Sequence, residues 1–199
     1  MLQKPSPILV VDRFPPLLEA LVALLADLSP ADWDRPTAAA GWTVKDIALH
    51  LLGDDLGLLS GQRDTFNGGW ISVSTWDELV AQINRSNAAW VEATRRISPR
   101  LLCDLLRFSG EQVTAYFRTL DLFATGGAVS WAGPDPAPVW LDVAREYTER
   151  WHHQQHIRQA VLRPGLLEPY YLGPVLAAFV QAVPRTLQPV DARRAPWFR

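Results

Sequence analysis

The sequence lacks several features that would place it in other classes of protein. Only one of its 199 residues, Cys103, is a cysteine, so no disulfide can form within the chain, and a reducing cytoplasm is the expected location. The net charge is −2 and no basic stripe is present, which argues against a nucleic-acid partner. No apolar run reaches 18 residues, and the N-terminal run is too short for a signal peptide. We therefore expect a soluble intracellular protein without a membrane partner.

The sequence does have long segments of helical periodicity. The hydrophobic content of 48% is enough for a packed core and excludes a disordered chain. No segment shows the alternation of a β-strand, and residues 124–140 form a loop rich in glycine and proline. We predict an all-α bundle over residues 1–187, followed by a tail at 188–199. The predicted helices span residues 12–28, 43–61, 75–97, 98–123, 139–161 and 172–187.

The second predicted helix carries both a start signal and an unusual glycine pattern. Thr43 and Asp46 have the spacing of a capping box, which places the start of the helix at Thr43. Gly53, Gly57 and Gly61 recur every four residues, and each costs about 1 kcal/mol relative to alanine inside a helix. This cost predicts that a neighbouring helix or a ligand approaches the glycine face closely.

Three of the four histidines lie within five residues on the fifth predicted helix. They are His152, His153 and His156. Glu149 and His153 are one helical turn apart and can reach the same ion, with His156 on the same face. His152 and His156 have the same spacing on a face rotated by about 60°. A stripe of acidic residues and histidines is also typical of a solvated helix face, so this helix alone leaves both interpretations open.

The fourth histidine, His50, lies in the apolar second helix. An imidazole buried there needs a polar partner, and Asp54, one turn later, can orient the ring or join a set of metal ligands. A single histidine in such a helix is more often a satisfied core residue than a ligand. Its combination with the later cluster favours a metal site.

Three segments resemble a known family. Residues 41–51 read GWTVKDIALHL, residues 149–158 read ERWHHQQHIR, and residues 129–134 read VSWAGP. They resemble the mycothiol-dependent maleylpyruvate isomerase-like metal-binding domains of the DinB-like superfamily. The resemblance implies a four-helix bundle with an additional C-terminal helix. It also implies that this chain stops before the second domain of longer relatives.

The resemblance also implies a metal centre. Its ligands would be His50, Glu149 and His153, with water completing the shell. His50, His152 and His156 form the alternative set. Two imidazoles and a carboxylate are the ligands of a catalytic zinc ion, and nickel is the second choice of metal.

The implied function is that of an enzyme. A metal-activated low-molecular-weight thiol such as mycothiol would attack an electrophilic substrate, in S-transfer or isomerisation. His156 is expected to act as an acid/base, a further ligand or a supporting group. Arg158 would hold a substrate carboxylate, with Arg145 and Arg63 as alternatives, and Trp131 would cover the thiol site.

Two other interpretations remain open at this stage. The first is a non-catalytic metal-binding or regulatory domain, with a homodimer as the expected assembly. The second makes Cys103 a nucleophile, although its apolar neighbours favour a buried, inert thiol.

Overall fold

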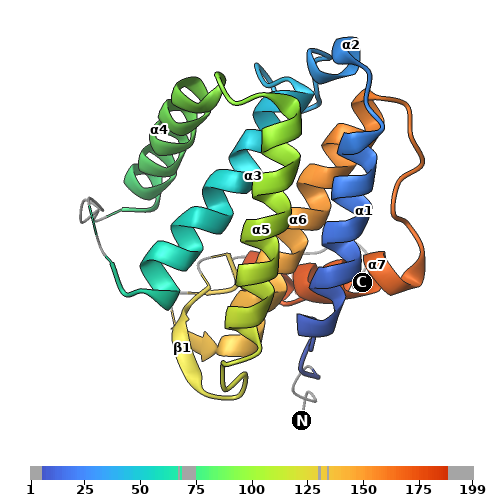
Figure 1. Ribbon diagram of the computed structural model, residues 1–199. Coiled ribbons are helices and arrows are strands. Elements are labelled where there is room, and N and C mark those ends of the chain that lie inside the picture. The colour runs from blue at the N-terminus through green and yellow to red at the C-terminus, as the bar shows by residue number, and fades with distance from the viewer. Residues whose placement is uncertain (1–5, 67, 69–74, 130, 134, 188–199) are drawn as a thin grey trace, which may run out of the picture. The chain divides into compact units, whose positions relative to one another are not determined.

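Figure 1 shows the computed structural model, which describes residues 6–66, 68, 75–129, 131–133 and 135–187. The tail predicted at 188–199 lies outside these residues. The chain divides into two compact units. The larger unit comprises residues 11–119 and 150–166, and the smaller comprises residues 1–10, 120–149 and 167–199. Residues of helix α6 (Val139–Ala160) up to Glu149 belong to the smaller unit, and those from Arg150 onward belong to the larger unit.

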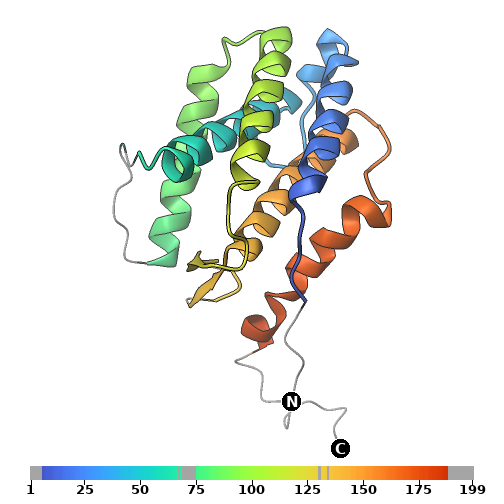
Figure 2. The same cartoon turned by 60° about the horizontal axis from the view of Figure 1, so that its bottom comes forward.

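The larger unit is helical and confirms the all-α prediction. Apart from the end of α6, its elements are η1 (Val11–Arg13), α1 (Phe14–Ala26), α2 (Pro30–Trp33), α3 (Val44–Leu58), η2 (Leu59–Arg63), α4 (Trp76–Thr94) and α5 (Pro99–Phe117). Helix α3 packs against both α4 and α5, and α5 packs against α1 (Figures 1 and 2). Helix α3 is therefore central, and it carries His50.

Side-chain caps fix where four of these helices begin, α2 to α5, with Ser98 capping α5. Thr43 and Thr75 each form a capping box, with Asp46 and Glu78 respectively, so the predicted start of α3 is confirmed. Ser29 caps the short helix α2, in a segment predicted as a loop. The helix predicted to begin at residue 12 begins at Phe14 instead, because Asp12 lies in η1 and α1 has no side-chain cap.

The core of the larger unit lies around α3. The apolar residues of α3 are almost fully buried, including Ile47, Leu49 and Leu52. Leu102 and Ile157 bring α5 and the end of α6 into the same cluster. Because α3 is buried on most sides, a polar side chain on it must find its partners within the protein.

The three glycines of α3 and η2, Gly53, Gly57 and Gly61, differ in their surroundings. A Cβ atom at Gly53 would lie 2.6 Å from Nε1 of Trp90, whose indole donates a hydrogen bond of 2.7 Å to the carbonyl oxygen of Leu49. The close approach predicted here is therefore made by a neighbouring helix, α4. At Gly57 and Gly61, no described atom outside the adjoining backbone lies within 4 Å of such a Cβ, so no neighbouring helix approaches these two closely.

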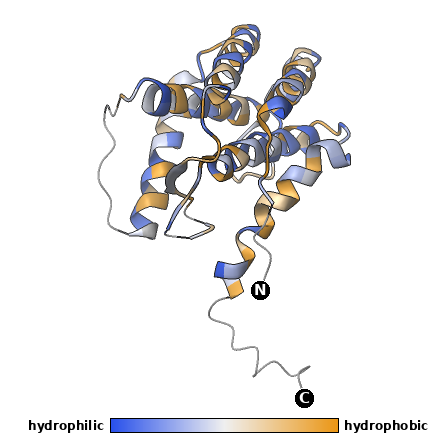
Figure 3. Ribbon diagram, turned by 90° about the horizontal axis from the view of Figure 1, so that it is seen from below, coloured by the Kyte–Doolittle hydropathy of each residue, from blue (hydrophilic) through white to orange (hydrophobic). Residues whose placement is uncertain are grey.

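The smaller unit contains the segment that was predicted as loop without strands. Strands β1 (Thr125–Ala128) and β2 (Pro136–Pro138) form an antiparallel pair there, which corrects that prediction. The strands are short, rich in glycine and proline, and mostly exposed, so no apolar alternation marked them. Helices α7 (Pro169–Val180) and α8 (Val183–Leu187) divide the predicted last helix, and Figure 3 shows apolar residues along α7. None of the helices in the described residues is long and apolar enough to cross a membrane.

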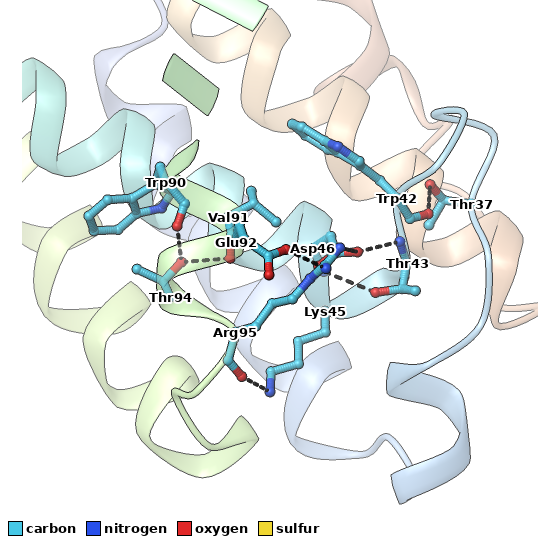
Figure 4. A network of polar contacts seen from close by, with 10 residues as sticks. All are labelled: Thr37, Trp42, Thr43, Lys45, Asp46, Trp90, Val91, Glu92, Thr94 and Arg95. Atoms are coloured by element: carbon cyan, nitrogen blue, oxygen red, sulfur yellow. Dashed lines mark hydrogen bonds and ion pairs between the residues drawn. The ribbon is translucent and has the colours of Figure 1, made fainter. Parts of the chain in front are cut away.

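A polar network holds the start of α3 against the end of α4 (Figure 4). Asp46 accepts hydrogen bonds from the Thr43 backbone N–H at 3.0 Å and from Arg95 Nε at 2.9 Å. Burial alone raises the pKa of Asp46, but the hydrogen bonds from Arg95 and Thr43 outweigh burial and bring the pKa below its usual value. The ionised carboxylate is therefore favoured in the folded state.

We expect Asp46→Asn to lower the free energy of unfolding at pH 7 by about 1–3 kcal/mol, because it removes charged hydrogen bonds. In the wild type, this stabilisation is present above the unfolded pKa of about 3.9 and is lost as the pH falls through the lower folded pKa. The variant should lose less stability between pH 5 and pH 2 than the wild type. Urea denaturation across this range measures both effects, and Asp64→Asn, at an exposed ion pair, is the control. Equal acid sensitivity of wild type and Asp46→Asn would contradict this prediction.

Candidate metal centre

The position of His50 follows from the turn that precedes α3. Gly41 adopts a φ of 82°, which L-amino acids disfavour, and Thr43 then starts the helix. The ring of Trp42, between them, packs on the His50 ring with centroids 5.0 Å apart. His50 itself is only 5% exposed. The motif at residues 41–51 therefore delivers one imidazole into the interior from α3.

Helix α6 supplies the second imidazole, that of His153. The ring centroids of His50 and His153 are 4.6 Å apart. Glu149 lies one turn before His153 on α6. One candidate ligand atom from each of His50, Glu149 and His153 lies within 4.8 Å of the other two.

This donor set fits a divalent metal ion. With metal–ligand bonds of about 2.0–2.2 Å, two ligand atoms of a tetrahedral ion lie about 3.4 Å apart. Side-chain rotations that move the three ligand atoms by about 1 Å would therefore bring them to this distance. Two neutral imidazoles and one carboxylate also leave a coordination position for water or substrate. Structural zinc sites are usually closed by four protein ligands, and this set of three has the composition of a catalytic site.

Asp54 contacts His50, as the sequence suggested. Its Oδ2 lies 3.2 Å from Nε2 of His50, one turn away on α3. Histidines that ligate metals commonly donate their second ring N–H to such a carboxylate, which fixes the orientation of the ring. Asp54 can therefore orient His50, or join the ligands as a fourth donor.

The other two histidines of α6 lie beside this cluster. The ring of His156 is 4.4 Å from that of His152 and 5.3 Å from that of His153, centroid to centroid. His152 is exposed and His156 is half-buried. The cluster formed by His50, Glu149 and His153 includes neither of them.

Arg158, predicted to hold a substrate carboxylate, contacts main-chain oxygens. It donates hydrogen bonds to the carbonyl of Pro164 at 3.0 Å and to that of Ala20 at 3.2 Å. It also donates to the side chain of Gln154 at 3.4 Å. Binding a substrate carboxylate would require these contacts to open.

The alternative arginines are also engaged with acidic side chains. Arg145 donates to Asp142 at 2.9 Å and pairs with Glu146. Burial lowers the pKa of Arg145, but the charges of Glu146 and Asp142 outweigh burial and raise the pKa above its usual value. Arg63 pairs with Asp64 at 2.8 Å. Both guanidinium groups therefore remain charged, and both are already paired with carboxylates of the protein.

Two further predicted residues lie elsewhere in the chain. Trp131 is half-buried in a turn, where the Ala132 N–H donates to the Val129 carbonyl. Cys103 is half-buried, and burial raises the pKa of its thiol, which reduces the reactive thiolate. This setting agrees with the inert thiol that its sequence neighbours suggested.

The structure also reveals a buried polar group that the sequence analysis missed. Arg150 forms an ion pair with Asp55 at 2.7 Å, and both side chains are largely buried. The two residues line a cavity of about 30 Å³ in the larger unit. None of the three candidate ligands is among the residues that line this cavity. The sequence signal for this pair is that Asp55 lies among the apolar residues of a helix, where a buried carboxylate needs a partner.

The helical architecture agrees with the DinB-like bundle fold predicted above. Residues 14–158 match the family described as the mycothiol maleylpyruvate isomerase N-terminal domain. The chain therefore belongs to this family. No curated protein matches the chain.

A solved structure supports the fold. It is a crystal structure of a histidine-to-alanine mutant of the mycothiol-dependent maleylpyruvate isomerase, with a TM-score of 0.52 and 13% sequence identity. The match covers 76% of this chain and 63% of the solved chain. The chain thus spans less than two thirds of this neighbour. At this identity, the likeness concerns the fold.

Proposed function

We propose that the protein is a divalent-metal-dependent enzyme that uses a low-molecular-weight thiol, such as mycothiol, in S-transfer or isomerisation. The observation that carries the proposal is the convergence of donor atoms from His50, Glu149 and His153 within 4.8 Å, in a chain of this family. Zinc is the metal we expect, with nickel as the alternative. The partners are the thiol and an electrophilic small molecule, and the cytoplasm is the location we propose.

The roles of the residues follow from their chemistry. His50 and His153 would bind the ion as neutral imidazoles, and the Glu149 carboxylate would offset its charge. A divalent ion held by these residues would lower the pKa of a coordinated thiol and so would supply a nucleophilic sulfur at neutral pH. Asp54 would keep the His50 ring in place through its contact with Nε2.

Further roles are proposed for residues near the cluster. His156, whose ring lies 5.3 Å from that of His153, would accept or return a proton during the reaction. Arg158 would hold a substrate carboxylate once its contacts with main-chain carbonyls open. Trp131 would cover the thiol.

A non-catalytic metal-binding or regulatory domain, with a homodimer as its assembly, is the second candidate. One observation favours it: the candidate ligand His50 is only 5% exposed, as expected for an ion that fixes the bundle from within. An enzyme needs an exchangeable coordination position that faces a pocket. Binding of a thiol to the loaded metal therefore separates the two functions.

The test is a thiol titration of the cobalt-substituted protein, purified without an affinity tag. We expect mycothiol to produce a new near-ultraviolet absorption band that saturates at one thiol per cobalt ion. The Cys103→Ser variant should give the same band, because Cys103 is not expected to take part. A cobalt spectrum that does not change at saturating thiol would reject the enzyme and favour the non-catalytic domain.

A further inference from the structure

A buried polar group joins the two helices that carry the candidate imidazoles. Arg150 on α6 donates from Nη2 to Oδ1 of Asp55 on α3 at 2.7 Å, and the side chains are 13% and 6% exposed respectively. The second carboxylate oxygen of Asp55 accepts a hydrogen bond of 2.7 Å from Ser109 Oγ on α5. The guanidinium also lies over the ring of Phe14 on α1, 5.6 Å from its centroid. Four helices therefore meet at one ion pair.

Net stability does not account for this pair. Taking two charges out of water costs several kcal/mol per ion, and replacing a buried ion pair by apolar residues is often neutral or stabilising. What the pair provides is a defined distance and direction. Apolar side chains tolerate a small slide between helices, whereas Asp55, with both oxygens engaged, tolerates little change at either oxygen.

The ion pair lies close to the candidate ligands along both helices. Asp55 follows His50 by five residues on α3, a rise of about 7.5 Å, and Arg150 precedes His153 by three residues on α6, a rise of about 4.5 Å. A slide of α3 along α6 by 1 Å would shift the two imidazoles relative to each other by the same amount along the helix axis. Metal–nitrogen distances in a good site vary by only about 0.2 Å.

We infer that Asp55 and Arg150 are positioning residues that set the separation of His50 and His153, and thereby the affinity and geometry of the metal centre. This inference rests on the ligand set of the proposed function. It adds a contact in the interior of the bundle, beyond the side chains that would touch the ion.

The test compares cobalt binding by the wild type with that of the double variant Asp55→Leu/Arg150→Met. The apolar pair should keep the unfolding free energy at or above that of the wild type, because no unpaired charge is buried. We expect its cobalt affinity to fall about 10- to 100-fold, the range typical when groups that support metal ligands are removed. The visible cobalt spectrum should also change shape, which a change in stability alone would not cause.

Two single variants complete the design. Arg150→Lys keeps the charge and should retain an affinity between those of the wild type and the double variant. Arg95→Gln removes the partner of another buried carboxylate on α3, Asp46, and should leave the cobalt spectrum unchanged. Wild-type cobalt affinity and spectrum in a folded double variant, or in Arg150→Lys if the double variant does not fold, would overturn the inference alone. Failure of the wild type to bind cobalt would overturn the proposed metal centre together with it.

Discussion

His153→Ala is expected to abolish stoichiometric binding of a divalent metal by this protein. The imidazole of His153 lies against that of His50 and one turn from Glu149, so its removal leaves two donors from a set of three. Losing groups that only support ligands already lowers metal affinity 10- to 100-fold. The loss of a ligand should therefore weaken binding by at least about 100-fold. Chelator competition measures the affinity, and elemental analysis of tag-free protein measures the stoichiometry.

Neighbouring histidines provide the controls for this prediction. His50→Ala should have the same effect as His153→Ala, and Glu149→Gln should weaken binding. His152→Ala removes an exposed imidazole next in the chain and should retain the metal. The opposite pattern, with metal lost from His152→Ala and kept by His153→Ala, would favour the alternative set of His50, His152 and His156.

Gly53→Ala is expected to destabilise the protein by about 1–3 kcal/mol, although alanine is the better helix former. The new Cβ would lie 2.6 Å from Trp90 Nε1, so the indole must move and its 2.7 Å hydrogen bond to the Leu49 carbonyl would be lost. Overpacking of this kind outweighs the gain in helix propensity of about 1 kcal/mol. Urea denaturation, followed by circular dichroism, measures the change in the free energy of unfolding.

Gly57→Ala is the matched control, one turn further along the same helix. No described atom lies within 4 Å of a Cβ at Gly57, so the variant should be stabilised by up to about 1 kcal/mol. The two variants should therefore change stability in opposite directions. Equal stabilisation by both would show that Trp90 does not constrain α3 at Gly53.

Much of the fold could be predicted because its signals are local. The capping box of Thr43 and Asp46 places the start of α3, and Ser98 before Pro99 caps α5. These caps act within one turn of helix, so the neighbouring sequence contains their whole cause. Strands β1 and β2 lacked such a signal because they are short and mostly exposed.

The candidate site shows the same division. The one-turn spacing of Glu149 and His153 is a property of a single helix and was visible in the sequence. The ion pair of Asp55 and Arg150 joins residues 95 positions apart, and the local sequence of neither helix predicts this pairing. Helix α5 also contains a glycine, Gly110, whose missing side chain is explained only by a residue of another helix. A Cβ there would meet Leu18 of α1 at 2.8 Å.

The helices, most of their ends, and the presence on two of them of side chains able to ligate a metal could all be predicted from the sequence. Periodicity, capping and ligand chemistry are properties of short segments, so they can be recognised without knowing how the helices pack. The packing of the helices, in contrast, brings His50 against His153 and Trp90 against Gly53. It also joins α3 to α6 through one buried ion pair. Such contacts depend on how helices distant in the chain pack together, because the burial and close packing that select them arise only when the core forms.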